Sequence, residues 1–192
     1  RSFHALTASD TSYREYRKAT KFCAQASWRL GKWDDLEKYS SSLLEDRFDI
    51  FPGASSRPDF DGSFFSAILN IHRKRWNLAA KFIDDARQSM DSRFTALMSE
   101  SRKRAYPSMV TAQILSEMEE IISFRKLEER SLDSVDKHIA NKEDVEEARA
   151  RLVDVWRKRL EGCRVDAEVH SSIMAVRSLV LGPMDEVEAT LT

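Results

Sequence analysis

The sequence predicts an all-α fold in which antiparallel helix hairpins stack into a right-handed solenoid of the tetratricopeptide kind. Composition favours helices, because 5 glycines and 4 prolines among 192 residues are too few for a sandwich of many short strands. Apolar residues recur every three or four positions through most of the chain. Two segments also share a helix–turn–helix pattern with a tryptophan at the turn, Trp33 and Trp76, which indicates a repeat.

Charge, cysteine content and hydropathy argue against several classes of protein. The formal net charge is -1, which gives no overall electrostatic basis for binding nucleic acid. Cys23 and Cys163 lie far apart, without the spacing of a zinc site or a disulfide framework. No apolar run approaches the roughly 18 residues of a membrane-spanning helix, and the chain starts at Arg1 without a signal-peptide pattern. We expect a fragment of an intracellular protein.

The first predicted hairpin unit covers residues 12–46, after a weakly patterned start at 1–11. Gly31 can take the positive φ angle of a helix C-terminus, and Asp34 with Glu37 resembles a capping box that opens the second helix. The expected core face of the first helix consists of seven residues at helical spacing: Tyr13, Tyr16, Ala19, Phe22, Cys23, Ala26 and Leu30.

A loop insertion at 47–62 is expected before the second unit, 63–92, because this stretch contains two prolines and two glycines. A mobile insertion is the expected role of the loop, and a functional loop is the alternative. Trp33 and Trp76 take equivalent places in the two units, 43 residues apart. The tetratricopeptide period is about 34 residues, and the extra length fits inside the loop.

The third unit, 93–126, uses the later part of the stretch 83–122, in which two amphipathic helices are expected to meet near 98–101. Pro107 removes a helical hydrogen-bond donor, so a helix start or kink is expected near Tyr106. Residues 127–143 form a charged link, in which a short helix and a flexible segment both remain open. The apolar face after the proline consists of Val110, Ile114, Met118, Ile121 and Ile122.

The fourth unit, 144–182, contains two helices. Asp144 is expected to cap the first, which closes at Gly162. The second runs from about Asp166, and Gly182 followed by proline stops it.

Candidate functional residues are weighed against ordinary structural roles. The four histidines are scattered, and no nucleophile–base pair or metal set is evident, so we expect no catalytic residue, metal or cofactor in this segment. The acidic run at 117–120 is interpreted as a solvated face, with Glu117, Glu119 and Glu120 toward water. The tryptophans could form an aromatic binding groove, but packing is the favoured role. The predicted structural anchors are Trp28, Gly31, Trp33, Trp76, Tyr106 and Trp156.

Several short motifs along the chain resemble the FAT domain of phosphatidylinositol-3-kinase-related protein kinases, most closely that of target-of-rapamycin (TOR) kinases. They occur in the same order as in that family. The resemblance covers most of the 192 residues. Pro107 and His170 depart from the family pattern, and 47–59 and 128–144 look like expansions. The motifs are Trp28, Leu30-Gly31, Trp33-Asp34, Ala86-Arg87, Thr95-Ala96-Leu97, Glu100-Ser101, Arg104-Ala105-Tyr106, Met109-Val110, Gln113, the run from Leu115 to Ile122, the run from Arg159 to Cys163, and the run from Val176 to Val180.

The resemblance implies a scaffold segment of a serine/threonine protein kinase in nutrient and growth signalling. Such a segment clamps and positions the kinase domain and binds TOR complex subunits, and other helical repeats of the same chain are further partners. ATP and Mg would bind in the kinase domain of the parent, which is expected to be dimeric and cytoplasmic. Peripheral attachment to lysosomal, vacuolar or other endomembranes would come through complex partners. No nucleic acid partner is expected.

Arg177 is the basic residue that the resemblance singles out. It interrupts the apolar run 174–181, where a solvent-facing position or a salt bridge is the default reading. FAT domains of this family hold an inositol polyphosphate in a basic pocket, so the resemblance makes Arg177 a candidate contact for inositol hexakisphosphate in the full domain.

Two other functions stay open at the level of sequence. A free-standing tetratricopeptide-like adaptor would bind peptides in the groove of its helical array. The FAT segment of a DNA-damage-response kinase relative is the second alternative, although its match to the motif at 95–122 is weaker. An enzyme in its own right is a distant third reading, because no catalytic constellation is evident.

Overall fold

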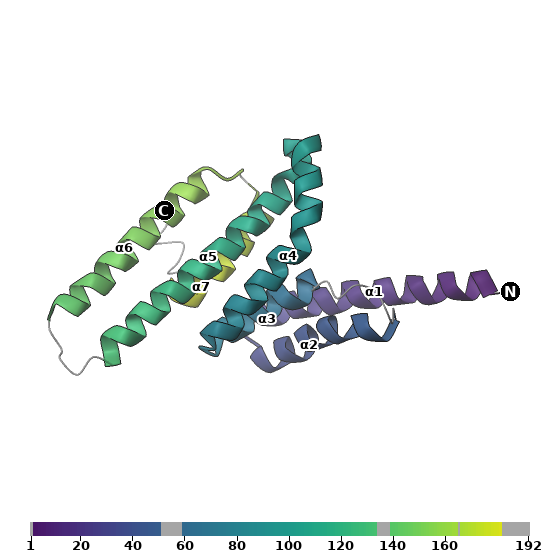
Figure 1. Ribbon diagram of the computed structural model, residues 1–192, viewed down its shortest axis with the longest axis horizontal. Helices are drawn as coiled ribbons and strands as arrows, with labels where there is room; N and C mark the ends of the chain where they lie inside the picture. Colours follow the sequence, from purple (N-terminus) through teal and green to yellow (C-terminus); the bar gives the residue numbers. More distant parts are fainter. Residues whose placement is uncertain (1, 51–58, 134–138, 165, 182–192) are drawn as a thin grey trace. The chain divides into compact units, whose positions relative to one another are not determined.

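The computed structural model describes residues 2–50, 59–133, 139–164 and 166–181, and the regular elements within these ranges are all α-helices. The chain divides into two compact units, Arg1–Ala96 and Leu97–Thr192. The predicted all-α class is confirmed, whereas the right-handed solenoid stays a prediction. The helices are α1 (Ser2–Arg29), α2 (Trp33–Ile50), α3 (Phe60–His72), α4 (Trp76–Glu100), α5 (Arg102–Asp133), α6 (Ile139–Glu161) and α7 (Ala167–Leu181) (Figure 1).

The turn between α1 and α2 ends the first helix with a left-handed residue. Gly31 has a φ angle of 67°, which glycine adopts without a Cβ penalty. Its N–H donates to the Trp28 carbonyl at 3.0 Å, and the Lys32 N–H donates to the Ser27 carbonyl at 2.8 Å. This is the Schellman pattern of helix ends. The predicted positive φ angle of Gly31 is confirmed, and the short turn makes α1 and α2 antiparallel neighbours.

The turn between α3 and α4 has the same geometry. Lys74 takes the left-handed position with a φ angle of 57°. Its N–H donates to the Ile71 carbonyl at 3.0 Å, and the Arg75 N–H donates to the Asn70 carbonyl at 2.9 Å. Each of these four residues lies 43 positions after its counterpart in the first turn.

The same offset relates the helices on either side of the two turns. Trp33 is the first residue of α2 and Trp76 is the first residue of α4, which confirms that the two tryptophans are equivalent. The two hairpins are therefore copies of one repeat. Three pairs of residues at this offset are fully buried: Ala24 with Ala67, Leu36 with Ala79, and Leu43 with Ala86.

Helix α3 is buried along most of its length and packs against α2 and α1. Asp59 caps it, because its carboxylate accepts a hydrogen bond from the Gly62 N–H at 2.8 Å. A Cβ placed on Gly62 would lie 2.9 Å from the Leu44 side chain and 3.2 Å from the Leu44 backbone nitrogen. The backbones of α2 and α3 therefore approach closely where glycine leaves room.

The expected loop at 47–62 is too long. Helix α2 continues to Ile50 and α3 begins at Phe60, so part of the range is helical at both ends. Turn-forming composition suggested a loop across the whole stretch, but Gly62 serves close packing inside a helix. Residues 51–58 lie outside the described part of the chain.

The predicted core face of α1 is wrong. Its residues Phe22 and Leu30 are 65% and 70% exposed, and Ala19, Cys23 and Ala26 are exposed as well. Helical spacing identifies an apolar face but not whether that face has a partner. The described side chains of α1 that are buried lie on another face: Thr20, Ala24, Ser27 and Trp28.

The end of α3 packs against the start of α2. Trp33 stacks on His72, with ring centroids 3.7 Å apart and an angle of 10° between the planes. Arg73 donates from Nη2 to Oε2 of Glu37 at 2.7 Å, and this hydrogen bond lowers the pKa of the Glu37 carboxyl. Glu37 therefore connects two helices.

The expected capping box at Asp34 is wrong. The Leu36 N–H donates to the Lys32 carbonyl at 3.0 Å, so α2 begins at Trp33 and Asp34 lies inside its first turn. An acidic side chain there still favours the helix start, because it complements the positive end of the helix dipole.

The second unit is organised around α5, which contacts both α6 and α7 (Figure 1). The expected third hairpin at 93–126 is wrong, because α4 extends to Glu100 and α5 is one continuous helix after Ser101. The two helices do meet near residues 98–101, as predicted. The start of α5 is marked by the Ala105 N–H, which donates to the Ser101 carbonyl at 3.0 Å.

Two helix starts precede their predicted positions. Pro107 lies inside α5, in its second turn, so it removes one hydrogen bond near the helix start without preventing the helix. Helix α6 begins at Ile139, so Asp144 lies within the helix rather than capping it. The serine at 101 is a favourable capping residue, and the sequence reasoning overlooked it.

The expected charged link at 127–143 is helical at both ends. Helix α5 continues to Asp133 and α6 starts at Ile139, while residues 134–138 lie outside the described part of the chain. Leucine, lysine, arginine and glutamate have high helix propensity. These residues therefore continue α5 to Asp133 although the apolar periodicity of the stretch is weak.

The predicted end of α6 and the predicted start of α7 agree better with the structure. Asp166 accepts hydrogen bonds from the backbone N–H groups of Glu168 and Val169 at 2.9 and 3.1 Å, and so it caps α7, at the predicted start of the helix. Helix α6 ends at Glu161, before Gly162. The predicted stop at 182–183 lies outside the described residues.

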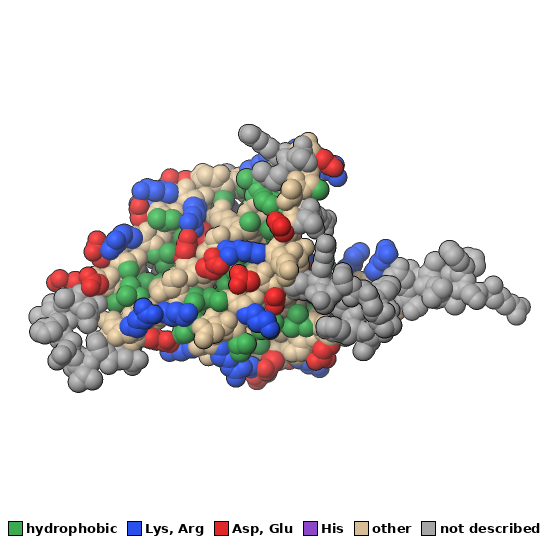
Figure 2. All heavy atoms as spheres, viewed as in Figure 1, with side chains coloured by type: hydrophobic (Ala, Val, Ile, Leu, Met, Phe, Trp, Pro, Cys, Tyr) green, Lys and Arg blue, Asp and Glu red, His purple; other side chains and the backbone are tan. Residues whose placement is uncertain are grey.

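The described surface carries both signs of charge. Figure 2 shows basic and acidic side chains interspersed on the viewed face. Asp154 accepts hydrogen bonds from Lys158 and Arg157, which lower the pKa of its carboxyl. Within the described helices, none has a stretch long and apolar enough to cross a membrane.

Candidate functional site

The centre of the second unit is a buried ion pair between α5 and α7. Arg177 donates from Nε to Oε2 of Glu117 at 2.8 Å and from Nη2 to Oε1 at 2.7 Å. Both side chains have no exposed surface. Gln113 donates a further hydrogen bond to Oε1 of Glu117 at 3.1 Å. A two-pronged geometry of this kind matches the planar guanidinium to the carboxylate.

The interpretation of Glu117 as a solvated residue is therefore wrong. Glu117 lies three residues after Ile114 and four before Ile121, and this spacing places all three on the same side of α5. Because α6 and α7 both pack on α5, its covered surface is wider than the single stripe that the sequence reasoning assumed.

A second polar cluster joins α5 to α6. Trp156 is fully buried, and its Nε1 donates to Oε2 of Glu120 at 2.8 Å. Arg159 donates from Nη1 and Nη2 to the two oxygens of Glu120 at 2.9 and 2.7 Å. These hydrogen bonds are the main cause of the raised pKa of the Arg159 guanidinium. Glu120 is half-buried rather than turned fully toward water.

Trp156 also links the two clusters. The Cζ atom of Arg177 lies 5.3 Å from the centroid of the Trp156 ring, within the range of a cation–π contact. Helices α5, α6 and α7 are therefore joined by one group of charged and aromatic side chains. In this group, arginine nitrogens bind the carboxylate oxygens of Glu117 and Glu120, which favours a role in fixing the helices over proton transfer.

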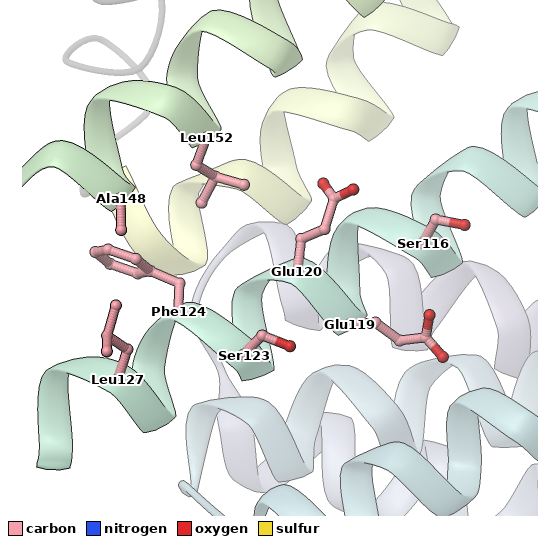
Figure 3. Close-up of a pocket in the computed structure, with 8 residues that line it drawn as sticks. All are labelled: Ser116, Glu119, Glu120, Ser123, Phe124, Leu127, Ala148 and Leu152. Atoms are coloured by element: carbon pink, nitrogen blue, oxygen red, sulfur yellow. The ribbon is translucent and has the colours of Figure 1, made fainter. Parts of the chain in front are cut away.

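A groove lies beside this group, between α5 and α6, with a volume of about 430 Å³. Figure 3 shows the side chains of both helices that border it. Phe124, Leu127 and Leu152 make part of its wall apolar, and serine and glutamate side chains add polar groups. Such a groove fits the apolar side chains of another protein segment. Its lining residues are Ser116, Glu119, Glu120, Ser123, Phe124, Leu127, Ala148 and Leu152.

The structure places Arg177 inside the core rather than at the surface. For a phosphate group to reach its guanidinium, the pair with Glu117 would have to open. Contact between Arg177 and an inositol polyphosphate therefore stays a prediction. In the part of the chain that the structure describes, no three His, Cys, Asp or Glu side chains gather as metal ligands would.

The predicted tryptophan anchors of the first unit lie at helix contacts. Trp28 is buried on α1 and meets Phe64 of α3 edge-on, with ring centroids 6.1 Å apart. Trp33 stacks on His72 at the other end of α3. Trp76 is half-buried at the start of α4. Trp28 and Trp33 therefore each contact an aromatic ring of α3, as packing residues would.

Tyr106 has a comparable place in the second unit. Its hydroxyl accepts a hydrogen bond from the backbone N–H of Arg164 at 2.8 Å. The guanidinium of the same arginine lies over the tyrosine ring, 4.5 Å from its centroid. The start of α5 therefore holds the segment that follows α6.

Comparison with known proteins places the chain in a family. The profile of the FAT domain matches residues 20–192. The chain is 35% identical over 173 residues to the serine/threonine-protein kinase TOR of Arabidopsis thaliana, an alignment that covers 88% of this chain. It is 34% identical to tor1 of Schizosaccharomyces pombe and 33% identical to TOR2 of Saccharomyces cerevisiae, over 93% and 94% of the chain.

These alignments cover 6% of each of the three relatives, so the chain corresponds to a small part of their length. The serine/threonine-protein kinase ATR of Arabidopsis thaliana is a more distant relative, with 26% identity over 88% of the chain and 6% of its own length. The chain belongs to the FAT domain family, and it resembles the FAT domains of the TOR serine/threonine kinases.

Proposed function

We propose that this chain is a scaffold segment of a TOR-like serine/threonine protein kinase. In this role it clamps and positions the kinase domain, binds subunits of a multiprotein complex in nutrient and growth signalling, and supplies no catalytic residue. The match of the FAT domain to residues 20–192 carries the proposal. The rest of the polypeptide supplies the kinase activity, with ATP and Mg bound in its kinase domain.

The packing of the second unit suits a rigid segment, which passes the movement of one of its helices to the others. Two carboxylates, Glu117 and Glu120, are each bound by an arginine from a neighbouring helix. Sliding α7 along α5 would break the fully buried pair of Glu117 and leave a charge without a partner, which costs several kcal/mol. Sliding α6 would break the half-buried pair of Glu120, at a smaller cost because water screens it. The three helices therefore move as one body, and a partner bound to one helix acts on all three.

The groove between α5 and α6 is the proposed contact for a complex subunit. Leu152 lines it, whereas Val155 is exposed on the same helix and does not line it. We propose to introduce Leu152→Arg and Val155→Arg separately into the native kinase, purify each complex and measure the subunits that remain bound.

Leu152→Arg is expected to lower the amount of one bound subunit at least tenfold, because it replaces an apolar side chain in the groove with a longer charged one that an apolar partner would have to desolvate. Val155→Arg adds the same side chain one turn away and is expected to retain all subunits. Equal retention by both variants, with circular dichroism spectra like that of the unaltered protein, would rule out the groove as the contact.

The proposal extends to the assembly and its location. The parent is a dimer in the cytoplasm, and its complex partners attach it to lysosomal, vacuolar or other endomembranes. A purified complex with the mass of a single copy of the kinase and its subunits would argue against the dimer.

Binding of inositol hexakisphosphate by the full FAT domain, with Arg177 as one contact, is a separate proposal. Arg177→Ala alone would leave the Glu117 charge buried without a partner, so the double variant Glu117→Leu with Arg177→Met is the cleaner test. A loss of polyphosphate affinity in the folded double variant of the longer protein would support the contact. Unchanged affinity would exclude it.

A further inference from the structure

The exposed apolar face of α1 is the surface that the rest of the first unit leaves uncovered. We call it the outer face of α1 and define it by Ala19, Phe22, Cys23, Ala26 and Leu30. All five side chains are exposed, and Lys18 and Arg29 border them. An apolar strip with charged borders is typical of a contact surface.

The internal repeat identifies the matching surface on α3. A shift of 43 positions relates the outer face of α1 to the surface of α3 formed by Gly62, Phe65, Ser66 and Leu69, with Arg73 as the counterpart of Leu30. These four residues of α3 are buried. Phe65 is 3% exposed, whereas its counterpart Phe22 is 65% exposed. The same surface of the repeat is covered in one copy and uncovered in the other.

The covering element in the second copy is α2. Helix α2 packs on α3, and the close contact between Gly62 and Leu44 lies within this surface. Since α2 is the second helix of the preceding hairpin, the first helix of the second repeat is covered by the second helix of the repeat before it. Ala19 takes the place of Gly62 in α1, so a small residue again lies at the expected point of closest approach.

We propose that the outer face of α1 is the docking surface for the second helix of a further hairpin of the same repeat, from the same polypeptide. The occupant is an amphipathic helix that lies along α1 as α2 lies along α3. Because Ala19 carries a Cβ where Gly62 has none, the occupant places a smaller side chain than leucine at this point or lies slightly farther out. This inference rests on the proposed scaffold function, because it requires a longer helical array.

The length of the relatives is consistent with such an occupant. The alignments cover 6% of each TOR relative, so proteins of this kind have ample sequence outside the matched region. A second copy of the chain is the alternative occupant, and the two are distinguished by concentration dependence.

Cys23 provides a direct probe, because it lies on the outer face and is exposed, while Cys163 is half-buried and lies elsewhere. The rate of maleimide labelling at both cysteines would be measured by mass spectrometry in this 192-residue chain and in the native polypeptide. Labelling of Cys23 is expected to be at least tenfold slower in the native polypeptide. Cys163 serves as the internal reference for differences in reagent and protein concentration.

Equal labelling rates for Cys23 in the two proteins would overturn the proposal. Protection that disappears on dilution would assign the surface to a second copy and would also overturn it. Phe22→Asp in the native polypeptide is expected to restore rapid labelling of Cys23, whereas Lys18→Asp, at the border, is expected to leave the protection intact. If Cys23 stays protected in the Phe22→Asp variant as well, the assignment of this face is contradicted.

Failure of the docking surface and failure of the proposed kinase function give different results. A native polypeptide with kinase activity and an unprotected Cys23 would refute the docking surface alone. A native polypeptide with a protected Cys23 and no kinase activity would refute the scaffold function in a kinase and leave the docking surface supported.

Discussion

The buried pair between Glu117 and Arg177 gives the sharpest test of how the second unit is held together. Replacing Arg177 with methionine keeps a long side chain in place but leaves the Glu117 carboxylate without its partner in a fully buried site. Breaking a buried pair on one side costs about 3–5 kcal/mol of unfolding free energy. The same loss is expected for Glu117→Leu, which leaves the guanidinium without its carboxylate.

The double variant is predicted to behave differently. With Glu117→Leu and Arg177→Met together, no buried charge remains without a partner, and the new side chains extend the apolar contact with Trp156. Replacing a buried pair with apolar residues of similar volume is often neutral or stabilising by about 1–4 kcal/mol. The double variant should therefore be at least as stable as the unaltered chain, and its two changes should be strongly non-additive.

The assay is urea unfolding followed by circular dichroism at 222 nm. With a slope of about 2 kcal/mol per molar urea, a loss of about 3–5 kcal/mol lowers the midpoint by about 1.5–2.5 M. The exposed pair between Arg151 and Glu147 is a matched control, and Arg151→Met should change the unfolding free energy by less than about 1 kcal/mol. Single variants within 1 kcal/mol of the unaltered chain, or a double variant with the summed loss of both, would refute the reasoning.

Three smaller predictions concern the first unit. Gly62→Ala should lower the unfolding free energy by about 1–3 kcal/mol, because the new Cβ would lie 2.9 Å from the Leu44 side chain; an unchanged or higher urea midpoint would contradict the close approach. Lys74→Gly should raise the midpoint, because a left-handed φ angle strains a residue with a Cβ by about 1–2 kcal/mol, and a lower midpoint would count against this account. Burial lowers the pKa of His72, and the charge of Arg73 has a smaller effect in the same direction. The neutral imidazole therefore contributes stability above its ordinary pKa of 6.5, and this contribution is lost as the pH falls through the lowered pKa. His72→Phe, which keeps a ring on Trp33, should remove that part of the pH dependence between pH 7.5 and 5, and an unchanged profile would exclude it.

The helical class and the repeat could be predicted from the sequence because they depend on local features. Gly31 marks a turn by its chemistry, and the two tryptophans at 33 and 76 mark the same position of the repeat. The turn between α3 and α4 at Lys74 could not be predicted in this way, because lysine has no preference for a left-handed conformation. Its equivalence to Gly31 appears only when the backbone hydrogen bonds are compared.

The interior of the second unit was harder to predict, because it depends on how many neighbours a helix has. The acidic run at 117–120 looks like a solvated face when α5 is expected to bury one stripe. Once two helices cover α5, Glu117 falls inside the buried surface and needs a cation. The interruption of an apolar run by Arg177 was the available signal, since a charge in such a run at helical spacing predicts a buried partner.

The error on α1 has the same physical origin. Apolar spacing at Ala19, Phe22 and Ala26 predicts that this face is covered, and within the described residues it is uncovered. The buried face instead contains Thr20, whose hydroxyl donates to the Tyr16 carbonyl at 2.9 Å. A short polar side chain can be buried when its own helix satisfies its hydrogen bond. Hydropathy alone therefore could not identify this face.

The most direct test of the central claim is to capture the native polypeptide with an antibody to this chain, then measure its mass and its kinase activity. A very large polypeptide that phosphorylates serine or threonine with Mg-ATP is the result that the scaffold account predicts. A native chain no longer than this one, without kinase activity, would contradict it and favour a free-standing adaptor that binds peptides.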